Sequence, residues 1–151
     1  MSGKTPPIHR AILDDRLLIE QILTGIRPGR RSIEFHTTAY WYFRACRAAI
    51  AGAGGHLAGP FEQLDSGMQR RAIQSLLELP DEIALPDPRF TVPLMAEVSR
   101  RHPRLNLLNL EAVAAALVLQ ANVWLSIESA SGVLPQVLDA EDIPWTVVTI
   151  P

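Results

Sequence analysis

Cysteine is nearly absent from this 151-residue chain, in which Cys46 is the only one. One thiol cannot form an internal disulfide or supply the several thiolate ligands of a structural metal site, so the sequence excludes both as sources of stability. Cys46 falls in a predicted helix, where a small buried hydrophobe is a more common role for cysteine than a reactive thiol. The fold must therefore rest on its apolar core.

Long hydrophobic runs and an excess of one charge are also missing. No window approaches the roughly 18 apolar residues of a membrane span, and the N-terminus holds no apolar stretch of signal-peptide length. Fourteen Lys and Arg residues against sixteen Asp and Glu residues give a net charge of −2. This balance argues against a strongly basic protein that binds nucleic acid over much of its surface, but it allows a local basic patch. We therefore expect a cytoplasmic protein without a membrane segment.

Apolar residues are plentiful, at 48% of the chain, and they occur in segments that alternate between strand-like and helix-like patterns. The length and this content favour one domain over residues 1–151. The alternation predicts an α/β fold, a three-layer α/β/α sandwich around a short, mostly parallel sheet. A glycine-rich stretch at 52–60 predicts a flexible connection. Strands are expected at 8–13, 32–36, 82–85, 122–126 and 145–150, and helices at 16–23, 39–51, 68–79, 90–101, 109–119 and 132–140.

Three carboxylates lie one or two residues past the ends of predicted strands. Asp14 and Asp15 come after the first strand, and Glu128 comes after the strand at 122–126. Polar residues just past the carboxyl ends of parallel strands are the usual place for a functional site. Carboxylates within about 5 Å repel by roughly 3 kcal/mol at an effective dielectric near 20, a cost that a bound divalent cation removes. The pattern indicates a Mg²⁺ or Mn²⁺ site whose bound water could attack a phosphodiester.

Two segments resemble PIN-domain nucleases. Residues 11–23 (AILDDRLLIEQIL) form a short apolar strand that ends in an Asp and runs straight into a Leu-rich helix. Residues 105–129 (LNLLNLEAVAAALVLQANVWLSIES) are similar to a later block of that family. In that block an acid opens an Ala-rich helix, and an apolar strand ends in Thr or Ser, one spacer, then Asp. The resemblance implies a PIN-like, metal-dependent ribonuclease of toxin–antitoxin type, with RNA as substrate, an antitoxin-like partner and a homodimer.

The acidic set of that family carries over onto this chain only in part. Asp14 matches the first acid, and Glu128 matches the last acid with a longer side chain. The acid that opens the later helix is replaced by Asn109, an amide that offers a metal one neutral oxygen. The resemblance thus implies Asp14, Asn109 and Glu128 as catalytic residues, and these three together with Asp15 as ligands of Mg²⁺ or Mn²⁺.

A fourth acid of the family has no counterpart in the predicted helix at 39–51, where the candidate positions hold Tyr42, Phe43 and Arg44. One hypothesis is that the Arg44 guanidinium enters the acidic pocket, pairs with Asp14 and replaces the metal. The aromatic residues at the start of this helix are typical of core or interface packing, which also favours a homodimer.

Several interpretations stay open at this point. The chain is either a Mg²⁺- or Mn²⁺-dependent ribonuclease with weakened activity or a catalytically inactive PIN-fold binding or assembly protein. A third interpretation is an unrelated small α/β domain. In a purely structural interpretation, Asp14 caps its helix and Asp15 favours the helix dipole, and Asn109 and Glu111 play the same two roles for the later helix.

Overall fold

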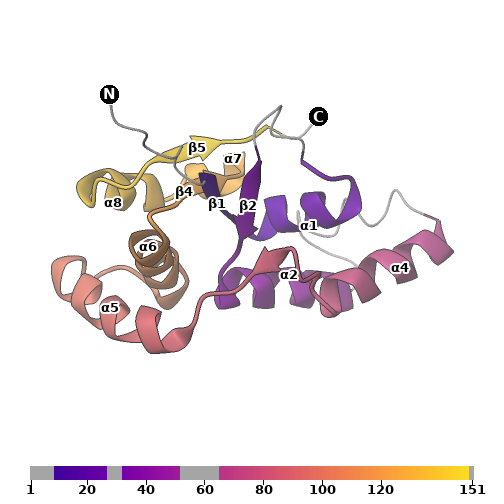
Figure 1. The fold of residues 1–151 in the computed structure, drawn as a ribbon, viewed down its shortest axis with the longest axis horizontal. Helices are drawn as coiled ribbons and strands as arrows, with labels where there is room; N and C mark the ends of the chain where they lie inside the picture. The colour runs from indigo at the N-terminus through magenta and orange to yellow at the C-terminus, as the bar shows by residue number, and fades with distance from the viewer. Residues whose placement is uncertain (1–8, 27–31, 52–64, 150–151) are drawn as a thin grey trace, which may run out of the picture.

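Five parallel strands form the centre of the molecule (Figure 1). The computed structural model describes residues 9–26, 32–51 and 65–149. Its strand order is β3-β2-β1-β4-β5, and Ile12 of the central strand stands opposite His36 on one side and Val123 on the other. The strands are β1 (His9–Leu13), β2 (Ile33–His36), β3 (Ile83–Ala84), β4 (Asn122–Leu125) and β5 (Trp145–Val147).

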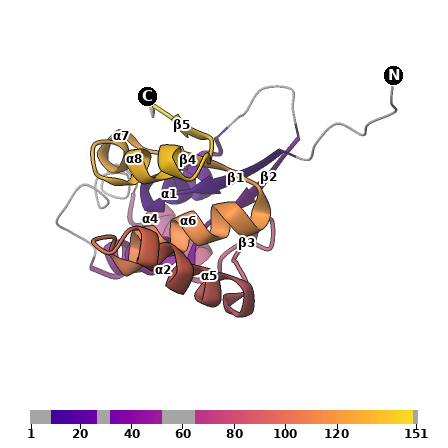
Figure 2. The ribbon, with the colours of Figure 1, turned by 90° about the vertical axis from the view of Figure 1, so that its left-hand side faces the viewer.

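Helices cover both faces of this sheet (Figures 1 and 2), which confirms the predicted three-layer α/β/α sandwich, with all strands parallel. Among the described residues, no helix has the length and apolar character needed to cross a membrane. The predicted connection at 52–60 lies outside the described residues. One face carries α1 (Asp15–Leu23), α2 (Ala39–Ala51) and α4 (Ser66–Leu77), the other carries α5 (Pro88–Arg101), α6 (Leu107–Leu119) and α8 (Leu134–Ala140), and the short α7 (Ile127–Ala130) follows β4.

Two apolar cores lie on the two faces of the sheet. Successive side chains of a strand point to opposite faces, so Ile12 and Leu13 are both fully buried but belong to different cores. Ile12 packs in the core of α5, α6 and α8, which Trp41 of α2 also reaches. Leu13 packs in the core of α1, α2 and α4. Trp124 and Phe35 pack against this core, with their two rings edge to face. Burial on both faces explains why β1 ends in three consecutive apolar residues, Ala11, Ile12 and Leu13.

The structure differs from the predicted elements mainly at their ends. Helix α6 begins at Leu107, before the predicted start at Asn109, because Asn106 supplies the cap. The Oδ1 atom of Asn106 accepts a hydrogen bond from the Asn109 N–H at 2.9 Å. Strand β4 ends at Leu125, one residue earlier than predicted, because Ser126 caps the unpredicted helix α7. Asn109 is therefore not the cap of its helix.

Cys46 lies partly buried in α2 beside the core of α1, α2 and α4. The neighbouring Tyr42 hydroxyl donates hydrogen bonds to the carbonyls of Leu76 at 2.8 Å and Leu77 at 3.0 Å, and so ties α2 to α4. Burial raises the pKa of the Cys46 thiol and of the Tyr42 hydroxyl. Both groups therefore stay protonated near neutral pH and serve in packing.

Candidate functional site

The carboxyl ends of three adjacent strands bring polar residues together at one edge of the sheet. Asp14 follows β1, Thr37 follows β2 and Ser126 follows β4. The Asp14 N–H donates to the carbonyl of Trp124 at 3.3 Å, and the Thr37 hydroxyl donates to the carbonyl of Leu13 at 2.8 Å. The sheet topology thus builds the edge at which the sequence predicted a site.

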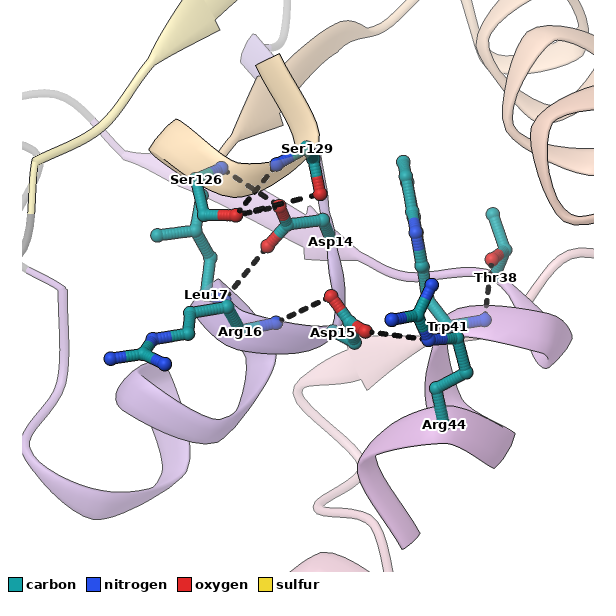
Figure 3. A network of polar contacts seen from close by, with 9 residues as sticks. All are labelled: Asp14, Asp15, Arg16, Leu17, Thr38, Trp41, Arg44, Ser126 and Ser129. Atoms are coloured by element: carbon teal, nitrogen blue, oxygen red, sulfur yellow. Dashed lines mark hydrogen bonds and ion pairs between the residues drawn. The ribbon is translucent and has the colours of Figure 1, made fainter. Parts of the chain in front are cut away.

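Asp14 is the most buried polar side chain of this edge, with no exposed surface. Its Oδ1 atom accepts a hydrogen bond from the Leu17 N–H at 2.9 Å, which makes Asp14 the N-cap of α1. Its Oδ2 atom accepts from the N–H of Ser126 at 2.7 Å and from the Ser126 hydroxyl at 2.6 Å (Figure 3). Three donors of the protein itself therefore satisfy this carboxylate.

Asp15 points away from Asp14, toward α2. Its side chain is 4% exposed, and its Oδ1 atom accepts a hydrogen bond from the Arg16 N–H at 2.9 Å. The Nε atom of Arg44 lies 3.0 Å from Asp15 Oδ2 (Figure 3). The hypothesis that Arg44 pairs with Asp14 is therefore wrong in its partner, because the guanidinium of Arg44 meets the neighbouring carboxylate instead.

The N-terminus of α2 is completed by a carboxylate from a distant helix. Glu111 of α6 is buried, and its two carboxylate oxygens accept hydrogen bonds from the N–H groups of Ala39 at 3.0 Å and Tyr40 at 2.8 Å. The Thr38 hydroxyl oxygen accepts from the Trp41 N–H at 3.1 Å. Glu111 thus serves the first turn of α2 instead of its own helix, a role that its position in the sequence did not reveal.

Among the described residues, no hydrogen bond or ion pair joins Asp14 to either of the other two predicted site residues. Asn109 is partly buried near the start of α6, and its backbone N–H donates to Asn106. Glu128 is exposed in α7. The residue of that segment that does reach Asp14 is Ser126, two positions earlier. The sequence signal for it was present, since Ser126 ends the apolar strand of the segment that resembles PIN domains.

The residues at this edge do not fit a divalent cation in the arrangement observed. Mg²⁺ and Mn²⁺ need several oxygen ligands that face the ion, whereas the Asp14 oxygens accept from protein donors and Asp15 faces Arg44. Within the described ranges, no group of three or more His, Cys, Asp or Glu side chains is arranged to hold a metal. The assignment of catalysis to Asp14, Asn109 and Glu128 stays a prediction.

The comparisons with known proteins bear on the fold. No protein-family model matches the sequence, and no curated protein matches it either. Among solved structures, the chain is similar to one described as the 2.2 Å resolution structure of VapBC-1 from nontypeable Haemophilus influenzae. The TM-score is 0.51 and the sequence identity 15%, over 91% of this chain and 97% of that chain. Together with the parallel five-strand sheet between two helical layers, this likeness supports a PIN-like fold for the chain.

Proposed function

We propose that this chain is a catalytically inactive PIN-like protein that acts by binding a partner protein of the antitoxin kind. The observation that carries this proposal is the contact between Arg44 and Asp15, with 3.0 Å between Nε and Oδ2. The resemblance implied Asp15 as one of the metal ligands, and a permanent cation of the protein lies beside this carboxylate.

The electrostatics of this contact oppose metal binding. Asp15 is almost fully buried and its charge is compensated by Arg44, while three hydrogen-bond donors compensate Asp14. A divalent ion about 4 Å from a guanidinium would be repelled by about 8 kcal/mol at an effective dielectric near 20. The ion would also have to displace the donors that satisfy Asp14. Both effects oppose the binding of a divalent cation, and the two carboxylates are already compensated without one.

Two observations support a binding role. The similar structure is that of VapBC, a toxin–antitoxin complex, in which a PIN-like chain is bound to a partner. In addition, α2 leaves Phe43 58% exposed and Ile50 71% exposed, and the Arg47 guanidinium lies over the Phe43 ring at 5.6 Å. Phe43 and Ile50 are seven residues apart and therefore lie on one face of α2, and exposed apolar residues gathered on one face are typical of contact surfaces. The same helix is the basis for the predicted homodimer, which stays a prediction.

Metal titration and an RNA cleavage assay test the proposal together. We expect no change in the melting temperature with millimolar Mn²⁺ and no cleavage of RNA above that of a Glu128→Gln control, in which the exposed residue is changed without risk to the fold. Saturable Mn²⁺ binding would contradict the proposal, because an ion present at 100 times its dissociation constant stabilises the native state by about 2.7 kcal/mol. Cleavage that Glu128→Gln abolishes would contradict it as well.

The second candidate is a Mg²⁺- or Mn²⁺-dependent ribonuclease with weakened activity. It is favoured by the position of Asp14 and Asp15, which both lie at the carboxyl edge of the sheet. Catalysis would require Asp14 to release Ser126 and Asp15 to release Arg44. The cleavage assay distinguishes the two functions, since only the nuclease shows metal-dependent loss of RNA.

A further inference from the structure

A separate cavity of about 360 Å³ lies away from the sheet edge, between the turn that joins α5 to α6 and the start of α8. Its walls include Pro103, Leu105, Val133 and Val137, and its accessible surface is mostly apolar. This volume lies in the range of small-molecule sites in proteins, which are mostly apolar with a few placed polar groups. The cavity is open to solvent on one side and has room for a short aliphatic group against its apolar wall.

Of the basic residues around this cavity, some are paired with an acidic residue in the described part of the protein and one is not. Arg101 donates two hydrogen bonds of 2.9 Å to the carboxylate of Glu141, and His102 Nε2 lies 2.8 Å from the same carboxylate. Arg101 and His102 therefore compensate the negative charge of the Glu141 carboxylate. Arg104 also lines the cavity, is exposed, and makes no ion pair or hydrogen bond with the described residues. The charge left for a ligand is therefore positive.

We propose that this cavity binds a short aliphatic carboxylate, with the hydrocarbon chain against Val133 and Val137 and the carboxylate on Arg104. Arg binds carboxylates through two parallel hydrogen bonds, which a neutral head group cannot replace. A phosphate alone would leave the apolar walls without a partner, because it has no hydrocarbon part. A carboxylate next to a short aliphatic group occurs in a free short-chain acid and also in the C-terminal Leu of a peptide. This proposal does not depend on the inactive or active state of the sheet edge.

Calorimetric titration of the whole chain with matched probes tests the proposal. We expect saturable binding of hexanoate or N-acetyl-leucine and at least tenfold weaker binding of hexan-1-ol, which has the same chain without the charge. Tighter binding of hexanoate identifies a free acid as the ligand, and tighter binding of N-acetyl-leucine identifies a peptide terminus. Failure of both acids to bind, or equal binding of hexan-1-ol, would overturn the proposal.

Three variants locate the binding. Arg104→Ala should weaken hexanoate binding at least tenfold, and Val133→Trp should block the cavity from its exposed rim. Arg89→Ala, an exposed arginine near the other end of α5, should bind as the unmodified chain does. Arg104 and Val133 are both exposed, so neither change threatens the fold, and a thermal melt confirms this. Unchanged affinity in both Arg104→Ala and Val133→Trp would overturn the assignment to this cavity.

Discussion

Arg44 and Asp15 form an ion pair in which only one partner reaches solvent. Asp15 is 4% exposed and Arg44 is 36% exposed. Arg44→Ala should lower the free energy of unfolding by about 2 kcal/mol, less than the loss of about 3–5 kcal/mol for a fully buried pair, because solvent screens the arginine. Urea denaturation measures this change.

A matched control for that prediction is Arg47→Ala on the same helix. Arg47 is exposed and contacts the face of Phe43, so its loss should cost no more than about 1 kcal/mol. If Arg44→Ala and Arg47→Ala are equally stable, the buried Asp15 contact contributes no more than an exposed contact does, and the electrostatic argument for the proposed function is lost.

Asp14 should be the costliest polar residue to replace, because one carboxylate accepts three hydrogen bonds. We expect Asp14→Ala to lower the stability by about 3 kcal/mol and Ser126→Ala by about 1 kcal/mol. The loss in the double variant should be smaller than the sum of the two single losses, because both single variants remove the same hydrogen bond between Asp14 and the Ser126 hydroxyl. Asp87→Ala is the control, since exposed Asp87 caps α5 and has only the cap bond to lose. Additive losses in the double variant would contradict the contact.

For single residues, the sequence predicted roles that depend on near neighbours in the chain. Asp14 as a helix cap follows from its position between an apolar strand and a Leu-rich segment, and the structure confirms it. The role of Glu111 could not be predicted, because its hydrogen-bond partners lie 71 and 72 residues away. The partner of Arg44 was missed for a geometric reason. Asp14 and Asp15 are adjacent, yet the start of α1 turns their side chains toward Ser126 and α2 respectively (Figure 3).

Helices α5 and α8 are joined through the carboxylate of Glu141. Hydrogen bonds from Arg101, followed by His102, hold the pKa of Glu141 below its usual range. A carboxyl group whose pKa is lower in the folded state contributes stability above its unfolded pKa of about 4.3, and this contribution disappears as the pH falls through the folded value. Glu141→Gln should therefore cost about 1 kcal/mol at pH 7, and this cost should shrink as the pH falls from 5 to 3.

Urea denaturation at pH 7, 5 and 3 checks this prediction. The control is Asp142→Asn, because Asp142 is the exposed neighbour and has a φ of 57° that Asn tolerates. The stability of Asp142→Asn should follow that of the unmodified chain at each pH. Parallel pH curves for Glu141→Gln and the unmodified chain would show that the contact does not link α5 to α8.

The elements themselves were predictable to different degrees. Helix α2 has the predicted bounds, Ala39–Ala51, because Thr38 gives a clear cap signal before it. Helix α6 starts earlier than predicted because Asn106, not Asn109, supplies the cap oxygen. Helix α7 was missed because four residues make about one turn, which is too short to show helical periodicity.

The whole molecule has one sheet shared by two cores, and each core has its own tryptophan reporter. Trp41 lies in the core of α5, α6 and α8, and Trp124 packs against the opposite core. In variants that keep only Trp41 or only Trp124, the fluorescence melt should coincide with the circular dichroism melt of the same variant. Coincidence is expected because neither core can open without exposing the sheet that both cover.

A fluorescence transition that precedes the circular dichroism transition in either variant would contradict this prediction. It would mean that one helical layer detaches before the sheet melts. The test also addresses the predicted organisation of residues 1–151 as one domain, since separate domains would melt in separate steps.

The contacts of Glu111 and Ser126 also impose an order on biosynthesis. The first turn of α2 obtains its carboxylate from 71 and 72 residues later in the chain, and Asp14 obtains two of its donors 112 residues later. At about 5–20 residues per second, a ribosome needs several seconds to supply them. The first half of the chain therefore leaves the ribosome with these groups unmatched. The last third to be translated is the part that commits the nascent chain to its native state.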